Sequence, residues 1–190
     1  MRNLVFIPGR LLAVMILVIT GCTPFGVGTS QQPKYYVLSS LYATDGPVSP
    51  LAELNRVSVG VGPVRFPRHL DRKEIVTRTG DNEVTIDEFA LWAGPLSENF
   101  NLVIAENLSV LLTSKQVAIF PWRSQYPIKF QVIVHVTRFD GQPGVEALLR
   151  VRWVILNEDT KEILYKDQST FKETATGRSM EALVAAKSRT

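Results

Sequence analysis

The sequence predicts a single α/β domain in which helices pack on a mixed β-sheet that includes an antiparallel three-strand meander. The 190 residues, of which 45% are hydrophobic and 21% charged, suffice for one domain with a core and are too few for two. Short β-branched runs bounded by Gly, Pro and Asp recur along the chain, as they do in strands. Apolar residues adopt helical spacing after Trp92 and again near the carboxyl end.

A secretory signal peptide is predicted before this domain. Arg2 and Arg10 precede an apolar run, Leu11 to Ile19, that is too short to cross a bilayer as a stable helix. The run closes with Ile-Thr-Gly and then Cys22, which resembles the bacterial lipobox. We therefore expect residues 1–21 to be removed and Cys22 to be acylated. The alternatives are a plain signal peptide with an accidental cysteine and an uncleaved anchor helix.

The predicted lipid anchor has consequences for location and charge. Cys22 is the only cysteine, so a disulfide or a cysteine-ligated metal inside the domain is excluded. Two or three acyl chains hold a protein on a membrane nearly permanently, whereas one chain holds it only marginally. Thr23 stands where an inner-membrane retention signal would have aspartate, so we expect the periplasmic face of the outer membrane. Loss of two arginines with the signal peptide lowers the formal charge from +3 to about +1, which gives no argument for nucleic-acid binding.

The segment 22–33 is predicted to be a flexible tether and residues 34–190 the folded domain. Gly, Ser, Thr, Gln and Pro dominate the tether, which has little to bury. The first strands are expected at Lys34 to Leu38, Arg56 to Val61 and Glu74 to Thr79. The Gly60-Val61-Gly62 sequence predicts a strand end or bulge, because the following prolines prevent the helix that a phosphate site would need.

The most secure helix follows Trp92. Pro95 suits the first helical position. Apolar residues then repeat at helical spacing, at Leu96, Phe100, Val103, Ile104, Leu108 and Leu111.

A short strand at Val117 to Phe120 and three longer strands complete the predicted sheet. In the first long strand, one face carries Ile128, Phe130, Val132, Val134 and Val136. In the second, Leu149, Val151, Trp153 and Ile155 face one side, and Arg150 and Arg152 face the other. The third ends near Phe171, so the three should form a meander with one solvated face. Met180, Leu183 and Val184 indicate a short final helix, marginal unless packed.

The sequence contains no recognisable catalytic, metal or cofactor site. The two histidines, His69 and His135, are isolated, and no Gly-x-Ser-x-Gly elbow is present. No carboxylate lies at ligand spacing from either histidine, and no Asp-rich loop resembles a calcium site. Acidic pairs such as Asp87-Glu88 are typical of solvated turns. We therefore expect neither an enzyme nor a bound metal or cofactor.

The most basic stretch is a candidate contact surface. This stretch could contact anionic head groups or an acidic partner through Arg65, Arg68, His69, Arg72 and Lys73. Acidic residues interleave at positions 71 and 74, so an ordinary solvated loop is the alternative. We take Arg68, Arg72, Arg150 and Arg152 as candidate partner contacts, because the core requires none of them.

Several segments of the mature chain resemble the ABC-type transport auxiliary lipoproteins, the family of paraquat-inducible protein C. The matching stretches are Tyr35-Tyr36-Val37-Leu38, Phe66-Pro67-Arg68-His69-Leu70-Asp71-Arg72 leading into Ile75-Val76-Thr77-Arg78, Trp92-Ala93-Gly94-Pro95-Leu96, and Arg138-Phe139-Asp140-Gly141. Each piece alone is weakly specific, but their order and spacing, together with the lipobox, cover most of the mature chain. One departure from the resemblance is the predicted carboxyl-terminal helix, which looks longer in relatives.

The resemblance implies an anticodon-binding-like α/β fold and a place in a lipid-transport assembly. The implied partners are an inner-membrane ABC transporter and a periplasm-spanning protein with mammalian-cell-entry (MCE) domains. The chain would dock the assembly at the outer membrane, with energy from the cytoplasmic ATPase, because it has no nucleotide-binding motif. A homo-oligomer is compatible with this role. The alternatives are a lipoprotein that itself binds a lipid or other apolar ligand in a pocket, and an envelope hydrolase.

Overall fold

The computed structural model describes residues 31–40, 57–112, 114–122 and 127–190. They belong almost entirely to one compact unit, Pro33–Thr190. The predicted signal peptide, Cys22 and most of the predicted tether lie outside the described residues. The domain is α/β, as the sequence predicts, but its strands form two sheets.

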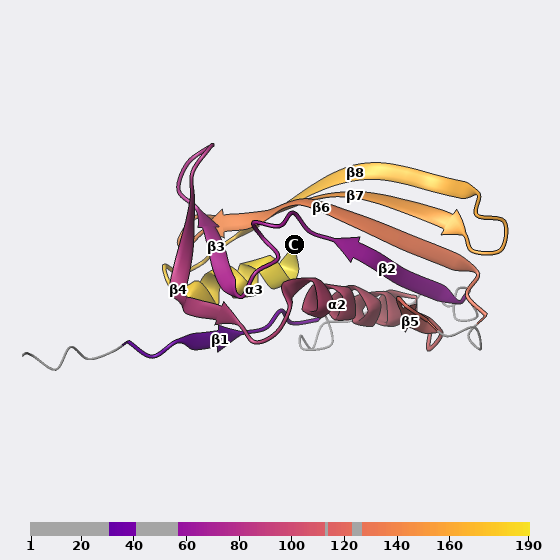
Figure 1. Cartoon of the computed structure of the whole chain (residues 1–190), viewed down its shortest axis with the longest axis horizontal. Coiled ribbons are helices and arrows are strands. Elements are labelled where there is room, and N and C mark those ends of the chain that lie inside the picture. Colours follow the sequence, from indigo (N-terminus) through magenta and orange to yellow (C-terminus); the bar gives the residue numbers. More distant parts are fainter. Residues whose placement is uncertain (1–30, 41–56, 113, 123–126) are drawn as a thin grey trace, which may run out of the picture. The chain divides into compact units, whose positions relative to one another are not determined.

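The elements follow one another as β1 (Lys34–Tyr36), β2 (Val59–Arg65), β3 (Glu74–Arg78), β4 (Val84–Trp92), α2 (Leu96–Leu111), β5 (Val117–Ile119), β6 (Phe130–Gln142), β7 (Glu146–Asn157), β8 (Ile163–Thr174) and α3 (Met180–Arg189). A three-stranded sheet has the order β1-β4-β3, and a five-stranded sheet has the order β5-β2-β6-β7-β8 (Figure 1).

The five-stranded sheet contains the predicted antiparallel meander, β6-β7-β8. The strand β2 runs parallel to both β5 and β6, so the sheet is mixed. The register of β2 against β6 shifts between Val61 and Val64, which confirms an irregularity beside the Gly60-Val61-Gly62 sequence. Gly62 has φ +115°, where a side chain would be strained, and a Cβ there would lie 2.9 Å from that of Phe120.

The three-stranded sheet includes a strand that the sequence analysis does not predict. Strand β4 pairs antiparallel with β3 and parallel with β1. Its ladder is interrupted, because Glu74 pairs with Leu91 while the next residue, Ile75, pairs with Asp87. The Asp87 carboxylate accepts hydrogen bonds from the backbone N–H groups of Phe89 and Ala90 at the bulge. This local capping replaces ladder bonds and breaks the apolar alternation that marks a strand.

The two helices lie on one side of the five-stranded sheet. The sequence correctly predicts α2, although Pro95 occupies the N-cap position and not the first helical position. The helix α2 packs on β2 and β5, whereas α3 packs on β6, β7 and β8 (Figure 1). The Ser179 hydroxyl caps α3 by accepting from the Ala182 N–H at 3.2 Å. Packing and capping together hold a helix of only ten residues.

The main core lies between the two helices, the small sheet and the helix-facing side of the large sheet. Three phenylalanine rings, Phe66, Phe100 and Phe139, meet edge to face with centroids 5.2 to 6.1 Å apart. They join the loop after β2, the helix α2 and the strand β6. Other buried members include Ile75, Trp92, Leu96, Val134, Val151 and Val184. A smaller cluster of Ala147, Ala175, Leu183 and Ala186 lies beneath α3.

Candidate functional site: a basic sheet face and an apolar groove

A row of basic side chains crosses the outer face of the five-stranded sheet. In the observed register, Arg65 of β2 lies beside His135 of β6, which lies beside Arg152 of β7. Paired residues of neighbouring strands project from the same face. This is the face away from the helices, because His135 is exposed between the buried Val134 and Val136. We call Arg65, His135, Arg150 and Arg152 the basic row.

The basic row is not neutralised within the part of the chain that the structure describes. Arg65 and Arg152 are exposed, Arg150 is half-buried, and none of the three forms an ion pair with a described residue. The candidate contacts Arg150 and Arg152 thus lie on a solvated face, beside Arg65 and His135. Sequence reasoning could not align these four, because the parallel register of β2 against β6 is not visible in the sequence.

The second predicted contact region, residues 66–72, begins directly after β2. In this segment the side chain of Phe66 packs into the core, while Arg68 and His69 are exposed. Arg72 instead donates to the Glu74 carboxylate at 2.7 Å. This hydrogen bond holds the pKa of Glu74 below its usual value. Arg68 is therefore available to a partner, whereas Arg72 already has one.

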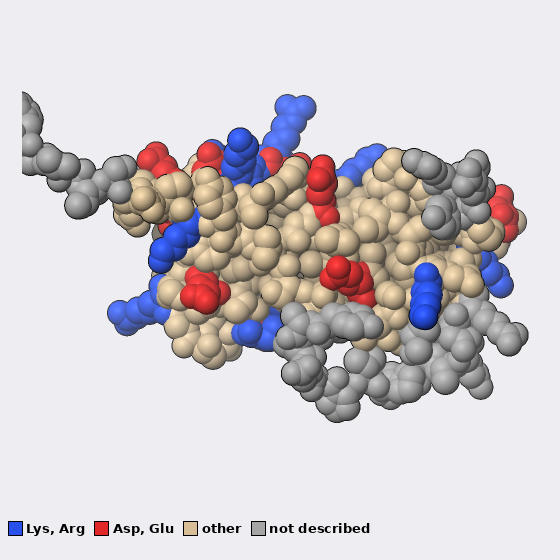
Figure 2. All heavy atoms as spheres, turned by 90° about the horizontal axis from the view of Figure 1, so that it is seen from below, with Lys and Arg blue, Asp and Glu red and all other residues tan. Residues whose placement is uncertain are grey.

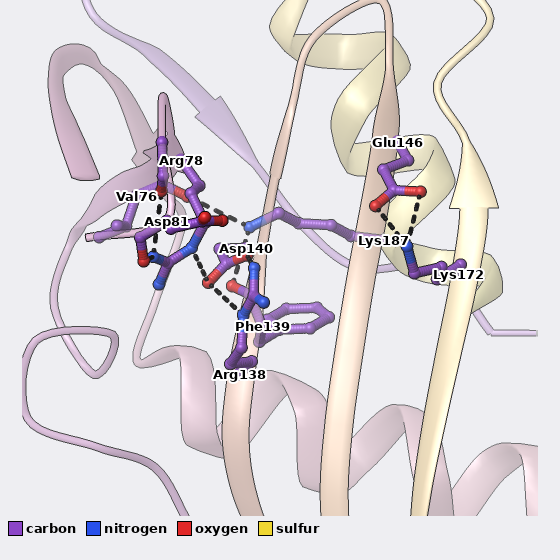
Figure 3. Close-up of polar contacts among 10 residues, drawn as sticks. Val76, Arg78, Asp81, Arg138, Phe139, Asp140, Glu146, Lys172 and Lys187 are labelled. Carbon is purple, nitrogen blue, oxygen red and sulfur yellow. Dashed lines mark hydrogen bonds and ion pairs between the residues drawn. The ribbon is translucent and has the colours of Figure 1, made fainter. Parts of the chain in front are cut away.

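A buried ion cluster joins the small sheet to the large one (Figure 3). The Asp140 carboxylate, 1% exposed, accepts from Arg78 Nε of β3 at 3.0 Å and from Arg138 Nη2 at 2.8 Å. Burial alone would raise the pKa of Asp140, but the hydrogen bonds from Arg138 and Arg78 outweigh it and the pKa is lowered. Arg78 also donates to the carbonyls of Gly80 and Asp81 in the β3–β4 turn. The cluster therefore fixes the β3–β4 hairpin against β6.

A buried lysine extends this cluster from α3. Lys187 Nζ donates to the carbonyl oxygens of Phe139 at 3.1 Å and of Val76 at 3.4 Å (Figure 3). It also lies over the rings of Phe139 and Trp92, at 4.8 and 5.8 Å from their centroids. Burial lowers the pKa of Lys187 to about 8, against the opposing effect of Asp140. The sequence resemblance includes all three of these neighbours, Val76 in one matched stretch and Phe139 and Asp140 in another, but it did not connect them with Lys187.

An apolar groove of about 480 Å³ opens on the helix side of the sheet. One wall is the side of α2 that carries Phe100, Ile104 and Leu108, and the floor consists of β6 to β8. Floor residues include Val132, Val151, Trp153, Ile155 and Phe171, and Lys187, Ser188 and Thr190 lie at one end. Trp153 stacks on Tyr165 with centroids 5.1 Å apart. In Figure 2, which looks onto the molecule from the side of α2, charged side chains are scattered among uncharged ones on the described surface.

The two histidines lie apart from each other in the described structure, and no group of three side chains that could hold a metal ion is found there. His135 lies beside two arginines on the sheet, and His69 is exposed in a turn. No helix among the described segments is long and apolar enough to cross a membrane.

Residues 36–190 match the family described as the ABC-type transport auxiliary lipoprotein component. The chain belongs to this family. The resemblance found in the sequence is thereby confirmed, and the protein is an auxiliary lipoprotein component of an ABC-type transport system. No curated protein matches the chain at a significant level.

Two solved structures with TM-scores above 0.6 share the fold. The protein XCC0632 from Xanthomonas campestris, of the DUF330 family, is 16% identical with a TM-score of 0.66, and the match covers 82% of this chain and 87% of that one. An uncharacterised protein is 22% identical with a TM-score of 0.65, with 83% and 90% covered. A PelC dodecamer from Paraburkholderia phytofirmans is more distant, with 18% identity, a TM-score of 0.39, and 75% and 90% covered.

Proposed function

We propose that this auxiliary lipoprotein is a non-catalytic docking component that holds an MCE-type transport assembly against the periplasmic face of the outer membrane. The observation that carries the proposal is the basic row, which is solvated and carries arginines without internal ion-pair partners among the described residues. Such a face suits an acidic partner surface, because complementary charge steers association and fixes orientation. Membership of an auxiliary transport family supports the same role.

The lipid anchor is the second part of the proposal. Acylation of Cys22 would hold the domain at the membrane, and the segment 23–33 would keep it close. The Cys22→Ala variant should remain as a soluble or inner-membrane-bound precursor without acyl label. Fractionation of the envelope after metabolic labelling with a fatty acid measures both properties. Unchanged outer-membrane fractionation with retained label would contradict the assignment of Cys22.

Charge reversal tests docking directly. The double variant Arg150→Glu, Arg152→Glu should lose co-purification with the MCE protein from native envelopes and increase sensitivity to detergents. Arg68→Glu tests the loop after β2 in the same assay. The matched control is Lys115→Glu, which reverses an exposed charge outside the basic row. All variants are first checked for unchanged thermal unfolding.

The outcomes separate docking from catalysis. Loss of co-purification in a stable, lipidated variant supports docking. Retained co-purification in all of these variants, together with a transport defect from His69→Ala or His135→Ala alone, would contradict docking and favour an enzyme.

A further inference from the structure

The apolar groove exists because the two helices cover different parts of the large sheet. The helix α2 packs on β2 and β5, and α3 packs across β6 to β8 near the Gly141 turn. Between these contacts, apolar side chains of β6 to β8 face outwards from the sheet, and neither α2 nor α3 packs directly on them. Trp153 and Ile155 are only half-buried, and Phe171 on the edge strand is 46% exposed. A contiguous, partly exposed apolar surface of this kind is typical of interaction and ligand-binding sites.

The indole, hydroxyl and ammonium groups along the groove are already hydrogen-bonded within the protein. Trp153 Nε1 donates to Ser169 Oγ at 3.0 Å. The hydroxyls of Ser188 and Thr190 donate to the carbonyls of Val184 and Lys187, and the Lys187 ammonium is directed to β3 and β6. A peptide in extended form would need partners for its own N–H and C=O groups, and the floor strands β6 and β7 are already paired with a neighbouring strand on both sides. A hydrocarbon chain needs none.

The dimensions of the groove suit one such chain. Along α2, the distance from Phe100 to Leu108 corresponds to about 12 Å at 1.5 Å per residue. Along β7, the distance from Leu149 to Ile155 corresponds to about 20 Å. The cavity is thus elongated, and its volume of about 480 Å³ lies within the range of small-ligand sites, roughly 300–1,000 Å³.

We propose that the groove binds one acyl chain of a diffusible phospholipid. The chain lies between α2 and the strands β6 to β8, in contact with Leu108, Trp153 and Phe171, and the head group remains in solvent. Each methylene buried there gains free energy from leaving water. The groove and the basic row lie on opposite faces of one sheet, so lipid binding and partner docking occupy separate surfaces and can fail separately.

Photo-crosslinking tests this proposal. The lipidated full-length protein is placed in phospholipid nanodiscs that contain phosphatidylethanolamine with a diazirine on one acyl chain, and crosslinked peptides are mapped by mass spectrometry. The added mass of a whole phospholipid distinguishes this lipid from the acyl chains of the protein's own anchor. We expect crosslinks on α2 and on β6 to β8 at residues that line the groove.

A matched pair of variants on α2 supplies the control. Leu108→Glu places a carboxylate in the groove and should lower the crosslinking yield by about tenfold or more. Leu111→Glu makes the same change at an exposed position of the same helix outside the groove and should leave the yield unchanged. Phe171→Glu, at the exposed rim, gives a second groove variant if Leu108→Glu unfolds.

A fluorescence measurement provides an independent readout. Trp153 lines the groove, whereas Trp92 and Trp122 do not. A nitroxide-labelled fatty acid should quench tryptophan emission in the wild-type protein and much less in Trp153→Phe.

Each outcome decides the proposal. Equal crosslinking of Leu108→Glu and Leu111→Glu, or crosslinks outside the groove, would overturn it. Groove residues that give no lipid crosslink, because a protein segment or a second copy of the chain covers them, would also overturn it. Lipid labelling that persists in the double variant Arg150→Glu, Arg152→Glu would show that the groove binds lipid even when docking is lost.

Discussion

The helix-facing side of the large sheet has two ends that differ in how they are covered. At the end near α3, Leu183, Ala147 and Ala186 are fully buried. Farther along the same strands, Trp153 and Ile155 carry the same alternating pattern but are only half-buried and border the groove. The alternation of apolar residues along a strand therefore specifies which face of the sheet is apolar. The position of the helices decides whether that apolar face becomes buried core or a binding surface.

Small residues explain why α3 closes its end of the sheet. Alanines at 147, 175 and 186 allow the helix to approach the strands closely. Gly141 shows how tight this region is, because a Cβ there would lie 2.3 Å from the Glu146 carbonyl oxygen and 3.0 Å from Leu183 Cδ1. The groove end of the sheet instead carries large side chains, such as Trp153 and Phe171.

Truncation at the closed end should give the largest loss of stability. Leu183 is 0% exposed, so Leu183→Ala leaves a cavity in addition to losing buried surface. We expect a decrease of about 3–5 kcal/mol in the free energy of unfolding. Urea denaturation followed by circular dichroism measures it. A decrease below about 1 kcal/mol would mean that α3 is not firmly packed in solution.

The ion cluster should give the next largest effect. Asp140→Asn keeps the side-chain shape but removes the one carboxylate among the described residues that bonds Arg78 and Arg138, leaving these two cations and Lys187 close together. We expect a loss of about 3–4 kcal/mol at neutral pH.

The pH dependence of the same variant provides its control. The pKa of Asp140 is lowered in the folded state, so its contribution is present at neutral pH and is lost as pH falls through the folded pKa. The difference between wild type and Asp140→Asn should therefore narrow in acid. A difference that is constant down to acidic pH would contradict the assigned ionisation.

The sequence predicts the periodic parts of this fold and misses the irregular ones. The helix α2 and the meander follow from regular apolar spacing over ten or more residues. The strand β4 escapes prediction because Asp87 caps a bulge in its middle. Arg150 and Arg152 are predictable as solvated from alternation alone. Their alignment with Arg65 depends on pairing between distant strands, and the groove depends on where α2 packs, so neither can be predicted from local pattern.

The buried Lys187 should make the closed end more stable in mild alkali. Its pKa is lowered by burial from about 10.5 to about 8 in the folded state, so between these values the unfolded chain binds more protons. Raising the pH therefore favours the folded form through this residue. The stability of the wild type relative to Lys187→Met should rise by about 2–3 kcal/mol between pH 7 and pH 10. Paired urea titrations at the two pH values measure it, and the Met variant subtracts the titration of all other groups. An unchanged difference would mean that the ammonium is solvated.

The smallest effect is expected in the groove, where the same Leu→Ala change as at position 183 removes much less buried surface. Leu108 is half-buried on α2, lines the groove and is not a member of the fully buried core. Alanine favours a helix slightly more than leucine does, and the open groove already leaves one side of Leu108 without protein neighbours. We therefore expect Leu108→Ala to cost less than about 1 kcal/mol in lipid-free protein. Addition of the phospholipid should widen the gap between wild type and variant, because a ligand that binds the folded form stabilises it in proportion to its affinity. A cost of 3 kcal/mol or more without lipid would show that the groove is closed in solution and would remove the contrast between the two ends of the sheet.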